Sequence, residues 1–430
     1  MMRSTGIAAA CAMLVASTGL APAALAQDQP ASTDHVTFTS WNFADATPAG
    51  SYSGTQDSGP ALTLARPTMT RTYTDPYATN PTPKPYDEGD WISPTVGTPF
   101  GLTELVSSWD ASTPGGSWIE VSVQGVTAAG ITSNWYALGR WADEDIDFHS
   151  TSVTGQGNEL ATVYTDTLHT LNGHTFTSYR IKVAEMRPAG SHATPSVRMV
   201  GAMASAVPGM SKQPTSATSM TQGKILDVPT YSQEIHRGEF PEYDNGGEAW
   251  CSPTSTSMDV AYWGDGPTQD QMAYIFKRYP DVVDPQVDYA ARHVFDYAYD
   301  GAGNWPFNTA YAATYGLDGF VTRLRSLREA EQFIKAGIPL VASIAFKSGQ
   351  LKGAGYKTSG HLMVIVGFTK TGDVVVNDPA SHLEPSDAAV RTTYDRAQFE
   401  TDWLTASGGT VYVIHPHGVP LPPAPAEANW

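Results

Sequence analysis

The sequence predicts two domains: an all-β, sandwich-like domain in residues 27–205, followed by an α+β domain in residues 224–416. Three observations support this division. Residues 91–205 contain short runs of alternating apolar and polar residues separated by turn signals, as in β-sandwiches. Residues 206–223 are rich in small, polar and helix-breaking residues and have no apolar period, which favours a linker. Beyond the linker, helix-starting patterns come first and apolar strands follow, as in α+β folds.

Residues 1–26 have the pattern of a cleaved export signal. Arg3 supplies a positive charge, residues 7–20 are mostly apolar, and Ala-Leu-Ala at residues 24–26 is typical of a cleavage site. We therefore expect the mature protein to be secreted or extracytoplasmic. No later stretch approaches the roughly 18 apolar residues of a membrane helix, so no membrane span is predicted.

The composition restricts the classes of partner. The chain has 430 residues, of which 25 are Lys or Arg and 43 are Asp or Glu, so its formal net charge is −18. Nucleic acids and anionic lipids bind basic patches, and this acidic balance argues against both as partners. A peptide or protein substrate is compatible with it.

Strands are predicted in the first domain wherever apolar residues alternate between turn signals such as Asn172-Gly173. The predicted strands are residues 117–123, 133–138, 159–165, 178–183 and 196–203.

Local signals also predict the elements of the second domain. Pro253 suits the first turn of a helix over 251–262, and capping boxes begin at Thr268 and Ser326. Residues 417–430, rich in Pro and Ala, are expected to be a frayed tail. The remaining predicted elements are a helix over 287–299 and strands over 339–346, 361–368, 373–377 and 410–414.

Cys251 is the only cysteine outside the predicted export signal, which contains Cys11. An exported protein with one thiol has no internal disulfide, so this thiol is a structural cysteine, an intermolecular partner or a reactive group. The start of a helix stabilises a thiolate. The acidic residues that precede Cys251 oppose a thiolate, and they are Glu239, Glu242, Asp244 and Glu248.

Two later residues could complete a thiol-based active site. His361 opens the apolar strand 361–368, and Asp378 ends the next strand before Pro379. A hairpin between these strands places both residues at the same end, near opposite one another. An imidazole oriented by a carboxylate is the partner that a nucleophilic thiol requires.

Four segments, in this order and spacing, resemble the signature blocks of the C-39-like peptidases. These are papain-like cysteine peptidases related to bacteriocin leader peptidases, and the resemblance covers residues 224–416. The segments are Asp227-Val228-Pro229-Thr230-Tyr231-Ser232-Gln233, Trp250-Cys251-Ser252-Pro253-Thr254-Ser255, Gly360-His361-Leu362-Met363-Val364-Ile365-Val366-Gly367-Phe368 and Val376-Asn377-Asp378-Pro379.

The resemblance implies a papain-like α+β fold and a role for each matching residue. Cys251 would be the nucleophile, His361 the general base and acid, and Asp378 the orienting residue. Gln233 would donate its side-chain amide to the oxyanion, beside the backbone N–H of Cys251. The chain departs from the family pattern at Ser252, where glycine is more common, and in the long acidic stretch before Cys251.

We therefore predict a secreted cysteine peptidase that needs no cofactor or metal ion, with peptides, proteins and cell-wall peptides as candidate substrates. The substrate-binding residues and the oligomeric state are not predicted. Two alternatives stay open: a thiol amidase or acyltransferase, and a catalytically lapsed glycan-binding protein whose platform would be Trp109, Trp118, Trp135 and Trp141.

Three further features have plain interpretations. His415 and His417 have metal-like spacing, but no Cys or further His cluster accompanies them, so a tail is expected here rather than a zinc site. Residues 142–147 are expected to be a solvated acidic loop rather than a calcium site. The β-rich domain is either a binding module or an inhibitory pro-segment.

Overall fold

The computed structural model describes residues 34–208 and 214–430, which belong to one compact unit. The predicted export signal, residues 1–26, lies outside the described residues, as does the part of the predicted linker at 209–213. Among the described residues, no helix is long and apolar enough to cross a membrane.

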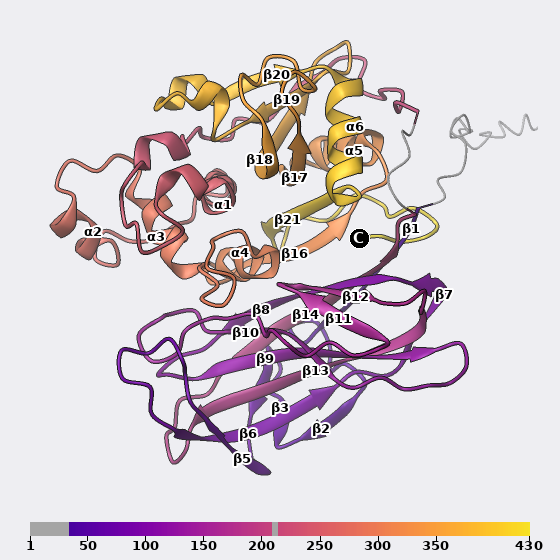
Figure 1. Cartoon of the computed structure of the whole chain (residues 1–430), viewed down its shortest axis with the longest axis vertical. Coiled ribbons are helices and arrows are strands. Elements are labelled where there is room, and N and C mark those ends of the chain that lie inside the picture. Colours follow the sequence, from indigo (N-terminus) through magenta and orange to yellow (C-terminus); the bar gives the residue numbers. More distant parts are fainter. Residues whose placement is uncertain (1–33, 209–213) are drawn as a thin grey trace, which may run out of the picture. The chain divides into compact units, whose positions relative to one another are not determined.

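The N-terminal region consists of two seven-stranded antiparallel sheets, which confirms the predicted all-β, sandwich-like fold (Figure 1). Apolar side chains of both sheets belong to one core. The first sheet has the order β11 (Ala161–Tyr164), β12 (Thr167–Thr170), β8 (Glu104–Ser112), β14 (Ser196–Ala206), β4 (Leu62–Leu64) and β3 (Thr55–Asp57), with β1 (His35–Asn42) on β14. The second has the order β10 (Tyr136–Trp141), β9 (Trp118–Thr127), β13 (Phe176–Pro188), β6 (Lys84–Ile92) and β2 (Ser51–Ser53), with β5 (Met69–Tyr73) on β6 and β7 (Val96–Leu102) on β13.

Strand β8 has no clear alternating pattern because both of its faces are covered. One face belongs to the sandwich core through Leu105 and Trp109. On the other, Ser108 Oγ accepts a hydrogen bond from Val321 N at 2.8 Å, and Asp110 Oδ1 accepts one from Gly319 N at 3.2 Å. A strand buried on both faces reads as a continuous buried run, and the sequence analysis did not predict this strand.

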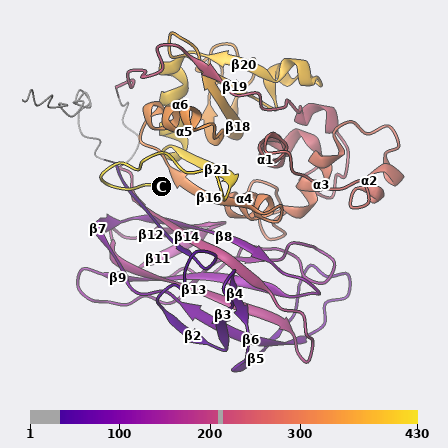
Figure 2. The same cartoon turned by 180° about the vertical axis from the view of Figure 1, so that it is seen from behind.

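The C-terminal region is an α+β fold, as predicted, built on a third antiparallel sheet (Figures 1 and 2). Its order is β16 (Leu317–Arg323), β21 (Thr410–Pro416), β17 (Leu340–Phe346), β18 (Thr358–Phe368), β19 (Val374–Asn377) and β20 (Arg391–Tyr394), with β15 (Lys224–Ile225) on β18. The helices are α1 (Cys251–Tyr262), α2 (Ala273–Arg278), α3 (Pro285–His293), α4 (Trp305–Ala313), α5 (Leu327–Ala336) and α6 (Arg396–Ser407). Four short 3₁₀ turns are η1 (Gln233–His236), η2 (Gly247–Ala249), η3 (Ser381–Leu383) and η4 (Asp387–Ala389).

Helices pack on this sheet where the active-site candidates lie. Helices α1 and α5 contact β18, α6 contacts β17, and α4 contacts β16. Helix α1 has the bounds that the sequence predicted, with Pro253 in its first turn. Helix α3 ends at His293, before the predicted end at residue 299. The Asp296 carboxylate accepts hydrogen bonds from the N–H groups of Ala298 and Tyr299 and holds the residues after the helix in a turn.

The C-terminal residues are not frayed, contrary to the expectation. Ala428 O accepts a hydrogen bond from Phe38 N of β1 at 2.9 Å. Asn429 is fully buried and donates to Arg323 O at 2.7 Å, and the Trp430 ring packs edge-on against Phe333 of α5 at 5.0 Å. Composition alone predicted fraying, but these long-range contacts fix the segment.

Candidate active site

Cys251 is the first residue of helix α1 and is partly exposed. The first N–H groups of a helix have no intrahelical partner. The preceding residue, Trp250, provides no side-chain cap for them, so they remain available at the end of the helix where the thiol lies. The indole N–H of Trp250 donates to Tyr243 O at 2.7 Å, which fixes the approach to the helix. Free N–H groups and the positive end of the helix dipole stabilise a thiolate here.

Two hydroxyl groups hold helix α1 on the sheet. Ser255 Oγ donates to Leu362 O at 3.0 Å, so the helix is bonded to strand β18 one residue after His361. Ser252 Oγ lies 2.8 Å from Tyr412 Oη on β21. The departure at Ser252 from the family pattern therefore gives this chain an extra buried contact between helix and sheet.

His361 lies between Cys251 and Asp378. Its Nε2 is 2.8 Å from Asp378 Oδ1, and both side chains are buried. Cys251 also raises the pKa of the imidazole. Because Asp378 engages Nε2, Nδ1 is the ring nitrogen left to face the thiol. The hairpin expected from the sequence is present, but Asn377 pairs with Val364, so Asp378 is offset from His361 rather than opposite it.

The charges in this trio support one another. Burial alone would lower the pKa of His361, but the charge and hydrogen bond of Asp378, together with Cys251, raise it to about 10. Burial would raise the pKa of Asp378, but His361 and two tyrosine hydroxyls lower it. At neutral pH the trio therefore contains an imidazolium and a carboxylate, and an imidazolium beside Cys251 stabilises a thiolate.

Two tyrosines hold the Asp378 carboxylate, and the sequence analysis missed both. The Tyr356 hydroxyl donates to the Asp378 oxygens at 2.9 and 3.0 Å, and the Tyr394 hydroxyl donates to Oδ2 at 2.8 Å. Ala380 N donates to Oδ1 at 3.1 Å. Burial and the neighbouring carboxylate raise the pKa of each tyrosine, which keeps both hydroxyls protonated as donors.

Gln233, the first residue of η1, lies in the same cavity as Cys251 and His361. Its backbone N–H donates to Pro379 O at 3.0 Å, which ties it to the residue after Asp378. The side-chain Nε2 donates to Glu248 O at 2.6 Å and lies 3.4 Å from Glu234 Oε1. Both amide hydrogens thus have acceptors, and the longer hydrogen bond, to Glu234, is the one that a ligand in the cavity could replace.

The cavity has a volume of about 540 Å³. Cys251, His361 and Gln233 share it with residues 356–362, which precede and begin β18, and with the end of α6. No residue of the β-rich region, 34–208, lines it. Three carboxylates line it, and these are Glu234, Asp244 and Glu248.

The acidic stretch before Cys251 is largely paired. Glu239 lies 2.8 Å from His236, and Glu242 pairs with Arg278. Glu248, whose side chain is 64% exposed, lies 3.3 Å from Arg237. Asp244 forms no ion pair with a residue in the described ranges, 34–208 and 214–430, and burial raises its pKa. The expected opposition to a thiolate is therefore reduced, because the stretch carries its own counter-ions.

The structure also tests the other candidates. Trp109, Trp118 and Trp141 are buried in the sandwich, which leaves Trp135 as the half-exposed member of the proposed platform. In the expected solvated loop, Asp145 forms a largely buried ion pair with Arg292 of α3. His417 lies 2.8 Å from Asp318 and 3.2 Å from Asp45, whereas the His415 ring contacts the Pro416 carbonyl.

Comparison with known proteins gives two family matches. Residues 37–205 match the family described as the Peptidase C39 N-terminal domain, and residues 225–411 match the Peptidase_C39 like family. No curated protein matches the chain.

Solved structures resemble the chain only distantly. A candidate C39-like peptidase from Bacillus anthracis is 17% identical over 44% of this chain and 96% of its own, with a TM-score of 0.28. The infectious bursal disease virus Gt strain structure is 14% identical over 33% of each chain, with a TM-score of 0.16. Such low TM-scores carry no information about function.

Proposed function

Because the chain carries a C39-like peptidase domain, we propose that it is a secreted cysteine peptidase that hydrolyses peptide bonds through Cys251, His361 and Asp378. The single observation that supports this best is the position of His361, which is hydrogen-bonded to Asp378 and lines the same cavity as Cys251. A thiol, an imidazole and an orienting carboxylate in this order are the parts of a nucleophilic active site.

In the proposed reaction, the Cys251 thiolate attacks the carbonyl carbon of the substrate. The oxyanion that forms accepts hydrogen bonds from the backbone N–H of Cys251 and from the weakly held amide hydrogen of Gln233. His361 gives its proton to the leaving amine, and the C–N bond breaks to leave a thioester on Cys251. Formation of the thioester removes the thiolate charge that helps to keep His361 protonated.

Deacylation uses the same groups with the proton moving the other way. The neutral imidazole of His361 takes a proton from water, and the hydroxide attacks the thioester carbonyl. Asp378 keeps the ring oriented through Nε2, so that the other nitrogen faces the reacting atoms. Collapse of the second tetrahedral intermediate releases the acid and restores the thiolate and the imidazolium.

Secretion and substrate class belong to the same proposal. Secretion rests on the export pattern of residues 1–26. The cavity is lined by charged groups of both signs, Glu234, Asp244, Glu248 and Lys357, which is compatible with peptide substrates. The glycan-binding alternative is weakened because three of its four tryptophans are core residues.

The proposal is tested by profiling the wild type and the Cys251→Ala variant against fluorogenic peptides and cell-wall peptides. We expect cleavage by the wild type alone, together with rapid alkylation of the wild type by iodoacetamide near pH 6. Alkylation no faster than that of a model thiol, together with absence of cleavage, would refute the proposal. If added amines are acylated in preference to water, the protein is an acyltransferase.

A further inference from the structure

A second cluster of chemically reactive side chains lies on the segment between Gln233 and Cys251. His236 ends η1, Glu239 follows three residues later, and Asp288 belongs to α3. His236 Nδ1 lies 2.8 Å from Glu239 Oε2 and 3.1 Å from Asp288 Oδ2, and the three atoms lie within 4.8 Å of one another. The His236 and Asp288 side chains are fully buried, and that of Glu239 is 18% exposed.

The single Nδ1 hydrogen of His236 cannot form a full hydrogen bond to Glu239 and to Asp288 at the same time. Nδ1 carries at most one hydrogen, and Glu239 is its nearer acceptor. Neither Asp288 oxygen has a hydrogen-bond partner among the described residues, although the side chain is fully buried. An unsatisfied buried carboxylate is costly. A buried Asp that is directed at the same nitrogen as Glu239 therefore indicates that a cation with more than one bonding position can take the place of the Nδ1 proton between them.

We propose that His236 Nδ1, Glu239 Oε2 and Asp288 Oδ2 bind a divalent metal ion of the zinc class. Two ligands about 2.1 Å from one metal ion lie about 3.0–3.4 Å apart at tetrahedral or octahedral angles. The separations of His236 Nδ1 from the two carboxylate oxygens, 2.8 and 3.1 Å, are close to this range. One imidazole and two carboxylates favour zinc and its first-row neighbours over calcium and magnesium, which take oxygen ligands. Because Glu239 is partly exposed, water can reach the metal ion there and serve as a further ligand.

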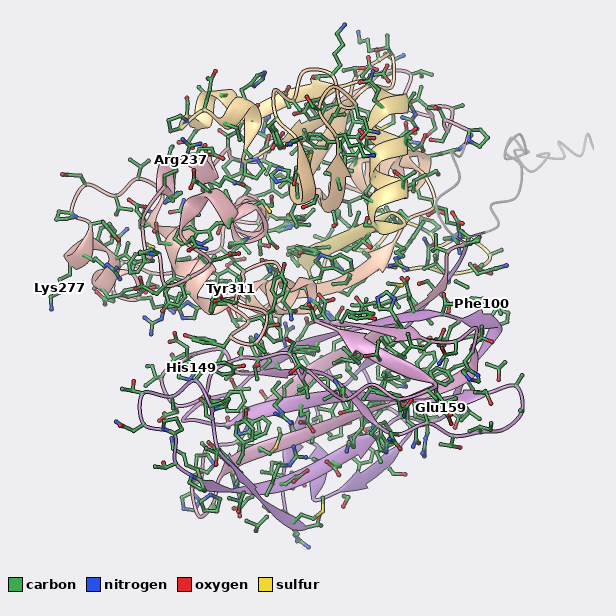
Figure 3. All side chains as sticks on the ribbon, viewed as in Figure 1. Phe100, His149, Glu159, Arg237, Lys277 and Tyr311 are labelled. Carbon is green, nitrogen blue, oxygen red and sulfur yellow. The ribbon has the colours of Figure 1, made fainter. Side chains whose placement is uncertain are left out.

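The ion would fix the segment that leads to the nucleophile. It would join η1, which begins with Gln233, to α3, and the His236 ring lies 6.1 Å from the ring of Trp250, the residue before Cys251. Arg237, labelled in Figure 3, already ties the same segment together by pairing with Glu234 and Glu248. The metal site is therefore structural, and it is distinct from the thiol site.

Metal binding is measured on the full chain without a histidine tag and in a Cys251→Ser background, so that the thiol cannot bind the ion. We expect one equivalent of zinc by elemental analysis and by calorimetric titration, and a higher melting temperature with zinc than without. In Glu239→Gln and Asp288→Asn, affinity should fall at least about 100-fold, since even the loss of an outer-shell partner costs 10- to 100-fold.

The matched control is His417→Ala, which removes another histidine that lies between two carboxylates, Asp45 and Asp318, but at an exposed position. It should leave zinc affinity unchanged. Circular dichroism identifies variants that fold, and either of the two ligand variants suffices for the comparison. Absence of saturable zinc binding, or binding that Glu239→Gln and Asp288→Asn both retain, overturns the proposal. Neither result depends on peptidase activity.

Discussion

Replacing Asp378 with asparagine removes the charge that keeps His361 protonated. With a pKa of about 10, all but about one His361 in a thousand carries its proton at pH 7. Burial is the largest influence on this histidine and it lowers the pKa. Without the Asp378 charge, only Cys251 opposes the effect of burial, so we expect the pKa of His361 to fall well below its value in the wild type and the neutral fraction at pH 7 to rise.

Two readouts follow from this change. The value of kcat/KM should fall at least about 100-fold, because proton transfer and imidazole orientation are lost together. The rate of Cys251 alkylation by iodoacetamide should also change its pH dependence. Near pH 6 the wild type should be alkylated faster than Asp378→Asn, because an imidazolium at His361 stabilises the thiolate.

The matched control is Asp45→Asn, which removes an exposed carboxylate 3.2 Å from His417 and far along the chain from the cavity. It should leave both readouts unchanged. Superimposable alkylation profiles for the wild type and folded Asp378→Asn would refute the reasoning, because they would show that Asp378 does not control the charge of His361.

The other predictions concern the supports of this site. Tyr394→Phe removes a 2.8 Å hydrogen bond to Asp378 and should lower kcat/KM about tenfold, whereas Tyr164→Phe, an exposed control, should not; equal rates would exclude a positioning role. Gly247→Ala would place a Cβ 2.4 Å from Gln233 O and should lower kcat, whereas Gly97→Ala meets open space and should have no effect. Since the pKa of His361 is raised, its stabilisation of the fold is complete below pH 6.5 and is lost towards pH 10. The free energies of unfolding of the wild type and Asp378→Asn, measured with denaturant, should therefore converge over that range. A constant difference between them would contradict this. Cleavage within 206–223 should not raise activity in the peptide assay, because residues 34–208 do not line the cavity; a rise would revive the pro-segment hypothesis.

The sequence carried enough information to predict where the trio lies. Cys251 is recognisable because Pro253 and the small residues after it start a helix, and α1 has the predicted bounds. His361 and Asp378 lie at the same end of a hairpin between two adjacent apolar strands, so their proximity follows from strand geometry. The offset of the pair could not be predicted, because a register shift between Ile365 and Gly367 changes the pairing.

The supports of the trio could not be predicted, because they depend on contacts between distant segments. Tyr394 reaches Asp378 only because the four-residue strand β20 pairs with β19, and so short a strand has no pattern of its own. The same limit applies to β8, whose alternation is lost where it packs between the sandwich and β16. A composition rich in proline predicted a frayed tail, yet the burial of Asn429 decides its structure.

The acidic stretch before Cys251 is compatible with a thiolate because most of its carboxylates form ion pairs with neighbouring basic side chains. Glu239 and Glu242 face His236 and Arg278, and the charge of Asp378 is matched by His361 at 2.8 Å. Interactions between charges fall with distance and are weakened by solvent, so the buried imidazolium of His361, which shares the cavity with Cys251, outweighs the exposed Glu248.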